Sequence, residues 1–267
     1  MSTTAIFGAG VMGETLLTGL LRGRWSPGDL LITEKRADRA AALRAAHGVD
    51  VVSNVEAAKR ASTLVLVVKP QDMDGLLTEI SSSVDPETLV VSLAAGITTS
   101  YLEERLPRGV AVVRVMPNTP ALVDEGIAAI SPGLHCDDAH LERAEEMLSA
   151  VGKVIRVPEN QQDAVTAISG SGPAYIFYIV EAMVEAGVLL GLPRATAMEL
   201  VVQTVYGSAT MLRETGEHPT VLRENVTSPA GTTAAALREL DDHKVRAAFL
   251  TAIEAARDRS RQLASGA

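Results

Sequence analysis

Three glycines near the amino terminus have the spacing of a turn that binds a dinucleotide. Gly8, Gly10 and Gly13 form a GxGxxG pattern directly after an apolar run and before a helical stretch. In such a turn the first glycine permits the sharp reversal, the second lets the backbone approach a pyrophosphate, and the third packs helix against strand. The free N–H groups of Val11 and Met12 would then face the phosphates at the positive end of the helix dipole. A glycine-rich turn can also be no more than a turn, but its place after a strand favours the binding site.

The segment after the second apolar run carries opposite charges where an adenosine ribose would lie. Glu34 follows the glycines at about the 20-residue distance at which an acidic residue bonds the ribose 2′-hydroxyl of NAD. Lys35 and Arg36 are its neighbours, and a basic pair holds the 2′-phosphate of NADP instead. We expect NADP, with NAD as the alternative, because two cations are present and Glu34 can turn toward solvent. A solvated strand-to-helix turn is the simplest other interpretation.

Three further segments follow predicted strands, at the edge of the sheet where ligands bind. Val68-Lys69-Pro70 places a cation after a buried run, where it reaches a phosphate or ribose or simply extends into solvent. Ala94-Ala95-Gly96 offers small residues and open backbone that a flat nicotinamide ring can approach. Asn118 would meet the carboxamide of that ring, although Asn before Thr-Pro is also an ordinary turn former. We expect all three segments to contact the cofactor.

Small and hydroxyl residues cluster before an alanine-rich helical stretch in the last part of the sequence. Ser228, Thr232 and Thr233 surround Gly231 there. Helix capping explains some of these hydroxyls, but capping alone does not require so many of them beside a glycine. The start of a helix also presents free N–H groups that bind a carboxylate. This segment is therefore a candidate site for an acidic ligand.

These segments need a sheet to position them. In the first part of the chain, apolar runs alternate with amphipathic helical stretches, and most runs are rich in Val, Ile and Leu without polar alternation. Strands buried on both faces have this composition. The repetition of strand and helix predicts an α/β fold with a doubly wound parallel sheet of Rossmann type. The predicted strands are residues 4–7, 30–33, 49–52, 63–68, 89–93, 110–115, 126–130 and 153–157, and helices are predicted at 12–24, 37–46 and 139–151.

After Pro158 the pattern is helical throughout. No convincing strand occurs between residues 161 and 263, and Gly-Pro and related pairs divide the segment into separate helices. We therefore predict a dinucleotide-binding domain of residues 1–158 and an all-α domain of residues 159–267.

The bulk composition argues against several function classes. The 24 Lys and Arg against 33 Asp and Glu give a net charge of −9, which is not the footprint of a protein that binds nucleic acid or anionic lipid. The longest apolar stretch, residues 174–192, contains Glu181 and Glu185, which are costly in lipid, so we expect a core or subunit interface there and no membrane span. Cys136 is the only cysteine, which excludes an intrachain disulfide and a thiolate cluster, and we expect no metal. We see no signal peptide and expect a cytoplasmic protein.

Two segments of the helical part resemble one known family. Residues 222–237 resemble the signature of pyrroline-5-carboxylate reductases, in which a hydroxyl residue, Pro, a glycine-rich turn and Thr precede a helix. Ser169-Gly170-Ser171-Gly172-Pro173-Ala174-Tyr175 resembles that family's entry to its first long helix. The strand-end segments occur in the family's order as well, so the resemblance covers nearly the whole chain. One departure is Ala230, where the family often has a second glycine.

The resemblance implies a fold, an activity and an assembly. It implies a Rossmann domain followed by a helical domain that interlocks with its twin in a homodimer, and assemblies of five dimers are also known in the family. The substrate would be 1-pyrroline-5-carboxylate and the product L-proline, in the last step of proline biosynthesis. Thr233 would hydrogen-bond the pyrroline nitrogen. Ser228 and the amides of Gly231, Thr232 and Thr233 would hold the carboxylate, which makes Thr233 and Ser228 the predicted catalytic residues.

Two other functions fit the same predicted architecture. Another imine reductase, or a β-hydroxyacid reductase, would have the same architecture. The hydroxyacid enzymes usually place a catalytic lysine on the long helix between the domains, and residues 171–190 contain no lysine. A non-catalytic protein that senses NAD(P) is the second rival, and the cluster of hydroxyls makes it less attractive. Hydride transfer to a cyclic imine mainly requires that two rings be oriented in contact, which agrees with the absence of an obvious acid–base pair.

Overall fold

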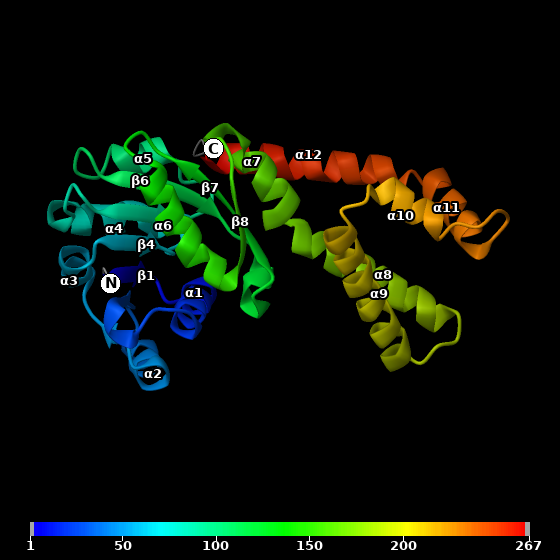
Figure 1. Cartoon of the computed structure of the whole chain (residues 1–267), viewed down its shortest axis with the longest axis horizontal. Coiled ribbons are helices and arrows are strands. Elements are labelled where there is room, and N and C mark those ends of the chain that lie inside the picture. Colours follow the sequence, from blue (N-terminus) through cyan, green and yellow to red (C-terminus); the bar gives the residue numbers. More distant parts are fainter. Residues whose placement is uncertain (1–2, 265–267) are drawn as a thin grey trace. The chain divides into compact units, whose positions relative to one another are not determined.

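The first part of the chain forms a single large sheet. The computed structural model describes residues 3–264, so the outermost residues of the two predicted domains lie outside it. The strand order is β3-β2-β1-β4-β5-β6-β7-β8, and the first five places have the order of a Rossmann sheet. Figure 1 shows the sheet with helices against it. The strands are β1 (Thr4–Phe7), β2 (Leu30–Thr33), β3 (Asp50–Val51), β4 (Thr63–Leu66), β5 (Leu89–Ser92), β6 (Ala111–Met116), β7 (Gly126–Pro132) and β8 (Gly152–Arg156).

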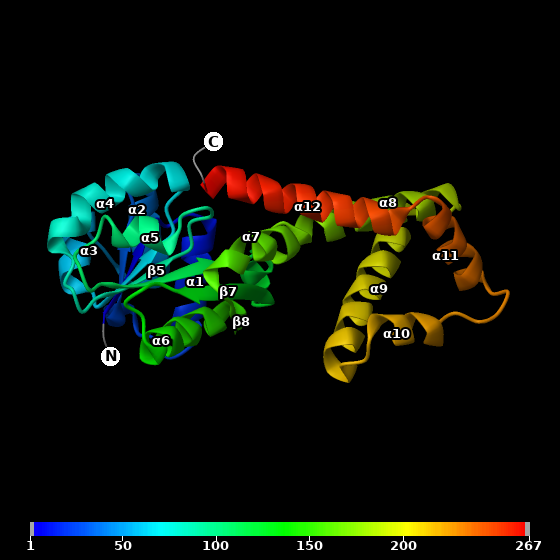
Figure 2. The same cartoon turned by 90° about the horizontal axis from the view of Figure 1, so that it is seen from above.

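Both faces of the central strands are covered, as their apolar composition predicts. On β1, Ile6 faces one apolar cluster while Ala5 and Phe7 face the other. Helix α6 (Asp138–Leu148) packs in the first cluster and α4 (Met73–Ile80) in the second, and Figure 2 shows them on opposite sides of the sheet. Burying one large side chain such as Ile6 contributes about 2 kcal/mol. The two cores therefore hold the strand ends in fixed positions.

Three helices of this part begin after polar residues whose side chains cap them. Ser53 and Thr98 accept hydrogen bonds from backbone N–H groups of α3 and α5, and Asp137 does so for α6. Besides α4 and α6, the helices of this part are α1 (Val11–Arg22), α2 (Ala37–His47), α3 (Asn54–Arg60), α5 (Thr99–Glu103) and the short α7 (Gln162–Val165).

The sequence predicts the positions of the strands well but misses the direction of two of them, since β7 and β8 run opposite to the other six. All eight predicted strands are present, and their ends differ from the prediction by at most two residues. The pair β6 and β7 is antiparallel, whereas the prediction was a parallel sheet. The connection between them holds only the 3₁₀ turn Thr119–Val123, and a parallel crossover needs about a dozen residues or more.

The chain divides into two compact units. One consists of Met1–Ser171 and Ala256–Ala267, and the other of Gly172–Ala255. The second unit is helical and contains α8 (Gly172–Leu189), α9 (Arg194–Thr215), α10 (Pro219–Asn225), α11 (Thr232–Asp242) and most of α12 (Val245–Ala264). Before α8 the residues Thr166–Gly170 form a π-helical turn, within the segment that resembles the family's entry to its first long helix.

The helical unit buries little of its apolar surface within one chain. Its core consists mainly of Val184, Ala197 and Val201, where α8 packs against α9. Gly187 permits this approach, since a Cβ on it would lie 2.9 Å from the Cβ of Ala197. The segment Glu159–Leu189 is long and apolar enough to cross a membrane, judged by length and composition only. Leu189 is 87 % exposed, so this surface requires a partner or another apolar environment.

Candidate active site

The predicted dinucleotide turn has the backbone that its glycines suggest. Gly8 has φ +97°, and a Cβ on Gly13 would lie 2.1 Å from the carbonyl oxygen of Gly8. Apart from Gly10 itself and its two chain neighbours, no heavy atom of residues 3–264 lies within 4 Å of the position that a Cβ on Gly10 would take. The backbone conformation of the turn thus requires glycine at positions 8 and 13. Gly10, in contrast, leaves open space in front of α1.

The start of α1 is available to an anion. Gly10 is its N-cap residue and supplies no side-chain hydrogen bond to the first turn. The N–H of Glu14 donates to Gly10 O at 3.0 Å, so the N–H groups of Val11 and Met12 precede the regular ladder of the helix. Open space, free donors and the positive end of a helix fit a pyrophosphate.

Glu14 fixes the charges beside this turn. Its carboxylate is 3.1 Å from His47 Nε2 and is also bonded to Arg39 on α2. The hydrogen bond with His47 lowers the pKa of Glu14, and the hydrogen bond from Arg39 adds to that effect. Arg39 is therefore neutralised by Glu14, which leaves Lys35, Arg36 and Lys69 as the predicted cations for a phosphate.

The β2 turn holds its acidic and basic residues in contact. Gly8 N donates to Thr33 O at 3.2 Å, which places the end of β2 beside the glycine turn. The Glu34 side chain is only 12 % exposed, and its Oε1 lies 3.7 Å from Arg36 Nε. Glu34 also accepts from the backbone N–H of Arg36 at 2.9 Å. Lys35 is exposed. The carboxylate therefore lies against Arg36 and does not extend into solvent.

The segment after β4 also reaches the glycine turn. The strand ends at Leu66 and not at Val68, two residues earlier than predicted. A Cβ on Gly8 would lie 3.1 Å from Val67 O and 3.3 Å from Val68 Cγ1. Lys69 and Pro70 follow at the surface. Lys69 is thus an exposed cation next to a turn, and its role toward the cofactor stays a prediction.

The two remaining strand-end segments differ in character. Ala94 is buried, Ala95 is exposed, and Gly96 has φ +77°, so residues 94–96 form a tight turn with accessible backbone. Asn118 Oδ1 accepts a hydrogen bond from Ile127 N at 2.9 Å. That bond gives Asn118 a structural function between β6 and β7. Of its side-chain amide, the Nδ2 group is then the part left for a ligand.

The hydroxyl cluster lies in the helical unit, at the start of α11. Gly231 is the N-cap of that helix and supplies no side-chain cap. A Cβ on Gly231 would lie 2.4 Å from Ser228 Oγ, and Gly231 N donates to Ser228 O at 3.0 Å. Ala230 has φ +59°, a conformation that favours glycine. Thr232 is exposed and Thr233 half-buried, both in the first turn of α11.

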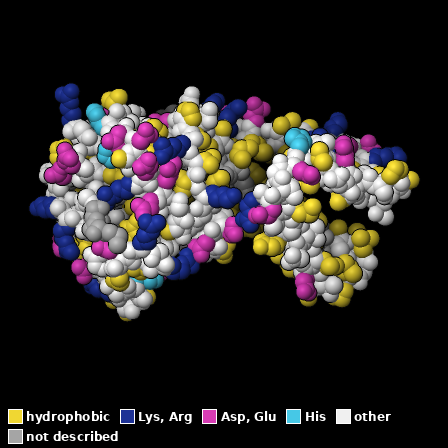
Figure 3. Space-filling view, in the orientation of Figure 1, with side chains coloured by type: hydrophobic (Ala, Val, Ile, Leu, Met, Phe, Trp, Pro, Cys, Tyr) yellow, Lys and Arg dark blue, Asp and Glu magenta, His cyan; other side chains and the backbone are white. Residues whose placement is uncertain are grey.

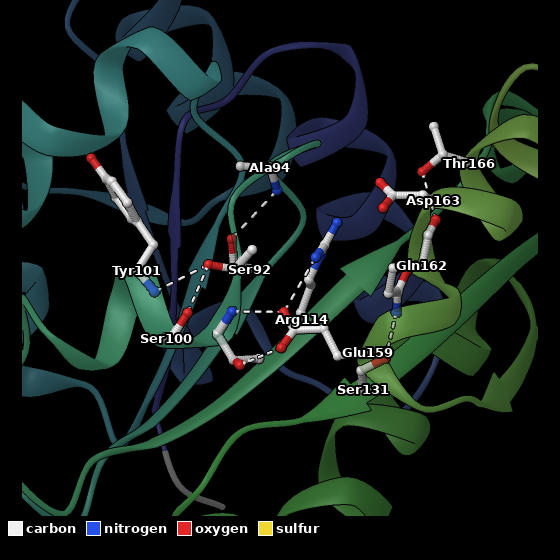
Figure 4. Close-up of polar contacts among 12 residues, drawn as sticks. Ser92, Ala94, Ser100, Tyr101, Arg114, Ser131, Glu159, Gln162, Asp163 and Thr166 are labelled. Atoms are coloured by element: carbon white, nitrogen blue, oxygen red, sulfur yellow. Dashed lines mark hydrogen bonds and ion pairs between the residues drawn. The ribbon is translucent and has the colours of Figure 1, made fainter. Parts of the chain in front are cut away.

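A buried polar cluster was missed by the sequence analysis. Figure 4 shows Arg114 on β6 directed toward Glu159, and Gln162 directed toward Ser131. Arg114 Nη1 lies 3.2 Å from Glu159 Oε1, and Gln162 Nε2 donates to Ser131 Oγ at 2.7 Å. The one signal for it was a single arginine inside the apolar run that forms β6.

Cys136 does not have the surroundings of a reactive thiol. Burial raises its pKa, and its Sγ is 3.0 Å from Val112 O. Among the residues 3–264 that the structure describes, no group of three or more His, Cys, Asp or Glu is placed to hold a metal ion.

The chain was compared with known proteins. Over 98 % of its length it is 45 % identical to the pyrroline-5-carboxylate reductase of Corynebacterium melassecola, of which it covers 99 %. The chain belongs to the pyrroline-5-carboxylate reductase family. The reductase of Mycobacterium tuberculosis is 43 % identical over 98 % of this chain and 97 % of the relative.

Family models and solved structures agree with this assignment. Residues 159–263 match the model for pyrroline-5-carboxylate reductase dimerisation, so the helical segment is a dimerisation domain of this family. Residues 3–96 match that of coenzyme F420-dependent NADP oxidoreductases. The structure of a pyrroline-5-carboxylate reductase from Coxiella burnetii has a TM-score of 0.93 at 37 % identity, with 98 % of each chain covered. The Plasmodium falciparum enzyme with NADP bound has a TM-score of 0.88 at 28 % identity, again with 98 % of each chain covered.

Proposed function

We propose that this protein reduces 1-pyrroline-5-carboxylate to L-proline with a reduced nicotinamide cofactor. The observation that carries the proposal is the family match along nearly the full length of both chains. The open, uncapped start of α1 supplies the matching local feature, because it fits the pyrophosphate of such a cofactor.

The predicted site residues divide into two sets. When bound, the cofactor supplies a hydride to C5 of the cyclic imine. Gly8, Gly10 and Gly13 with the N–H groups of α1 would hold its pyrophosphate, and residues 94–96 would face its nicotinamide. Thr233 would orient the pyrroline nitrogen, while Ser228 and the amides at the start of α11 would hold the carboxylate. At both helix starts the N-cap residue is a glycine that makes no side-chain hydrogen bond to the first turn, which supports this assignment. The N–H of Gly231 itself donates to Ser228 O, so the amides of Thr232 and Thr233 are the donors left for the carboxylate.

NADPH is the proposed cofactor, with NADH as the alternative. Lys35 and Arg36 offer two cations at the ribose position, and the relative from Plasmodium falciparum is described with NADP bound. Glu34 is the opposing feature, because its carboxylate already lies against Arg36. A 2′-phosphate would replace Glu34 as the partner of Arg36, which requires only that Glu34 turn away.

We propose a homodimer formed through the helical domain, and five such dimers as the larger assembly. Exposed apolar side chains gather on the helical unit (Figure 3). Most belong to α8 and α9: Ile176, Phe177, Tyr178, Leu189, Leu200 and Val202. A surface of this composition is typical of a permanent interface. The proposed enzyme is cytoplasmic and has functional domains of residues 1–158 and 159–267. The match of residues 159–263 to the dimerisation model supports this division.

A substrate panel tests the proposed reaction against its rivals. The purified protein is mixed with NADPH or NADH and with 1-pyrroline-5-carboxylate, other cyclic imines or the β-oxo acids that a β-hydroxyacid enzyme would reduce, and nicotinamide absorbance is followed. We expect rapid oxidation with 1-pyrroline-5-carboxylate only. Faster turnover of another imine would favour the related reductases. Stoichiometric cofactor binding without any turnover would favour the sensor.

A further inference from the structure

The turn proposed to face the nicotinamide is held at both of its ends. Residues 93–98 join β5 to α5, and the loop is defined as residues 94–98. At the first end, Ser92 Oγ accepts a hydrogen bond from Ala94 N at 3.4 Å. At the second end, Thr99 N donates to Glu159 Oε1 at 2.8 Å and Thr99 Oγ1 donates to Glu159 Oε2 at 2.6 Å. One carboxylate therefore accepts hydrogen bonds from both the backbone N–H and the hydroxyl of Thr99, the residue that follows the loop.

Glu159 is itself fixed by the sheet. Arg114 is buried on β6, and its guanidinium lies 3.2 Å from Glu159 Oε1. Strand pairing aligns Arg114 with Ser92 on one side and with Ser131 on the other, so these three side chains lie on one face of the sheet. A buried guanidinium requires a counterion, and Glu159 is that counterion. The sheet thus sets the position of Glu159, and Glu159 sets that of Thr99.

The end of α12 lies against the middle of the same loop. A Cβ on Gly96 would lie 3.6 Å from Ala264 N. Ser260 Oγ donates to Asp163 Oδ1 at 2.7 Å, which ties the end of α12 to α7. Glu159 therefore contacts the residue at the end of this loop, and Ala264 lies against its middle. The segments of these two residues are also joined to each other, through Ser260 and Asp163.

We propose that Glu159 is a positioning residue, which fixes the loop of residues 94–98 against the nicotinamide. The inference rests on the proposed function and goes beyond it, because Glu159 touches neither substrate nor cofactor in that scheme. An ion pair that serves folding alone would stabilise the protein without affecting the loop selectively. Glu159 instead accepts two hydrogen bonds from Thr99, the residue at which the loop ends, and this placement favours a positioning role.

Glu159→Gln is the first variant for a test. It keeps the size of the side chain but removes the charge that faces Arg114 and one acceptor for Thr99. Thr99→Val is the second variant, which removes only the hydroxyl and leaves the Arg114 ion pair intact. If Glu159→Gln does not fold, Thr99→Val tests the positioning role by itself. Glu145→Gln and Thr78→Val are matched controls. Glu145 bonds Arg156 at 2.6 and 2.8 Å, and Thr78 donates to Asp74 O in its own helix.

The first readout is amide hydrogen exchange of the protein without cofactor. We expect exchange of residues 94–99 to rise by about tenfold in Glu159→Gln and less in Thr99→Val, because the loop opens locally when its end is released. The controls should leave this segment unchanged. Uniform exchange at all sites in proportion to lost stability, or no change at residues 94–99, would overturn the positioning role.

The second readout is kinetic. We expect kcat to fall by about 10- to 100-fold in Glu159→Gln, since displacement of a positioned group by about 1 Å has effects of this size. The Kd for NADPH should change by no more than about twofold. The deuterium isotope effect with NADPH deuterated at C4 should increase. Wild-type kcat in both variants would overturn the inference, whereas an inactive wild-type protein would overturn the proposed reaction itself.

Discussion

Gly231 leaves room for the hydroxyl of Ser228, because a Cβ on Gly231 would lie 2.4 Å from Ser228 Oγ. We predict that Gly231→Ala displaces Ser228 and disturbs the amides at the start of α11. The KM for 1-pyrroline-5-carboxylate should rise by about tenfold or more, equivalent to about 1.4 kcal/mol of binding free energy. The Kd for NADPH, measured by calorimetry, should stay the same. An equal loss of both affinities would show that the loop does not serve the substrate alone.

Ala230 is strained, and the substitution Ala230→Gly should relieve it. A left-handed conformation costs a residue with a Cβ about 1–2 kcal/mol, and Ala230 has φ +59°. The greater chain entropy of glycine offsets about 0.5–1 kcal/mol of the gain. We expect the free energy of unfolding in urea to rise slightly, with kcat preserved. A loss of stability would mean that the Ala230 methyl group makes contacts that outweigh its strain.

Two glycine substitutions in the first turn should have different effects, one on cofactor binding and the other on stability. Gly10→Ala enters open space at φ −68°, so we expect the free energy of unfolding to change by less than about 0.5 kcal/mol. The Kd for NADPH should rise by about tenfold or more, because the methyl group occupies the space of the pyrophosphate. Gly13→Ala instead meets Gly8 O and should destabilise the protein by about 1–3 kcal/mol. Thermal unfolding and cofactor titration of both variants check this contrast. Unchanged NADPH affinity in Gly10→Ala would contradict the assigned pyrophosphate site.

Much of the fold follows from local sequence signals, and the remainder depends on long-range contacts. Strands β2, β4 and β5 are runs of Val, Ile and Leu with a single Thr or Ser at one end, so their location is encoded locally. The direction of β7 depends on how its connection packs, and no residue within β7 signals it. The glycine turn was predictable because conformation and spacing alone define it.

The polar cluster around Arg114 was not predictable in the same way. Its partners Thr99 and Glu159 are distant in the sequence and belong to different elements. The single arginine within β6 signals a buried charge, but nothing in the sequence identifies its counterion. Likewise, Asn118 has the sequence context of a turn, and only the structure shows that its Oδ1 accepts from Ile127 N.

Glu34→Gln should reveal which cofactor the β2 turn selects. If Lys35 and Arg36 hold a 2′-phosphate, removing the negative charge beside them should lower the KM for NADPH by about two- to fivefold, since a nearby like charge disfavours an anion. The KM for NADH should rise, because Glu34 would otherwise bind the ribose hydroxyls. The ratio of kcat/KM values for the two cofactors is the measurement. A loss of NADPH activity together with NADH activity would contradict NADPH selection.

The ion pairs of Glu14 should make the free energy of unfolding depend on pH. The pKa of Glu14 is lowered from its ordinary value of 4.5 by the hydrogen bonds from His47 and Arg39. A carboxyl group with a lowered folded-state pKa stabilises the fold above its unfolded pKa, and this contribution is lost as pH falls through the folded value. Glu14→Gln should therefore cost no more than about 1 kcal/mol at neutral pH, because the pair is partly exposed. Urea unfolding should show this difference shrinking below pH 4.5. A constant difference at all pH values would contradict the ionic origin.

The central claim is tested most directly by the identity and amount of product. The purified protein is given 1-pyrroline-5-carboxylate and a limiting amount of NADPH, and the mixture is analysed for L-proline by chiral chromatography while NADPH absorbance is followed. We predict one molecule of L-proline for each NADPH oxidised, at a rate proportional to protein concentration. NADPH oxidation without proline, or a folded protein that produces neither, would contradict the proposed function.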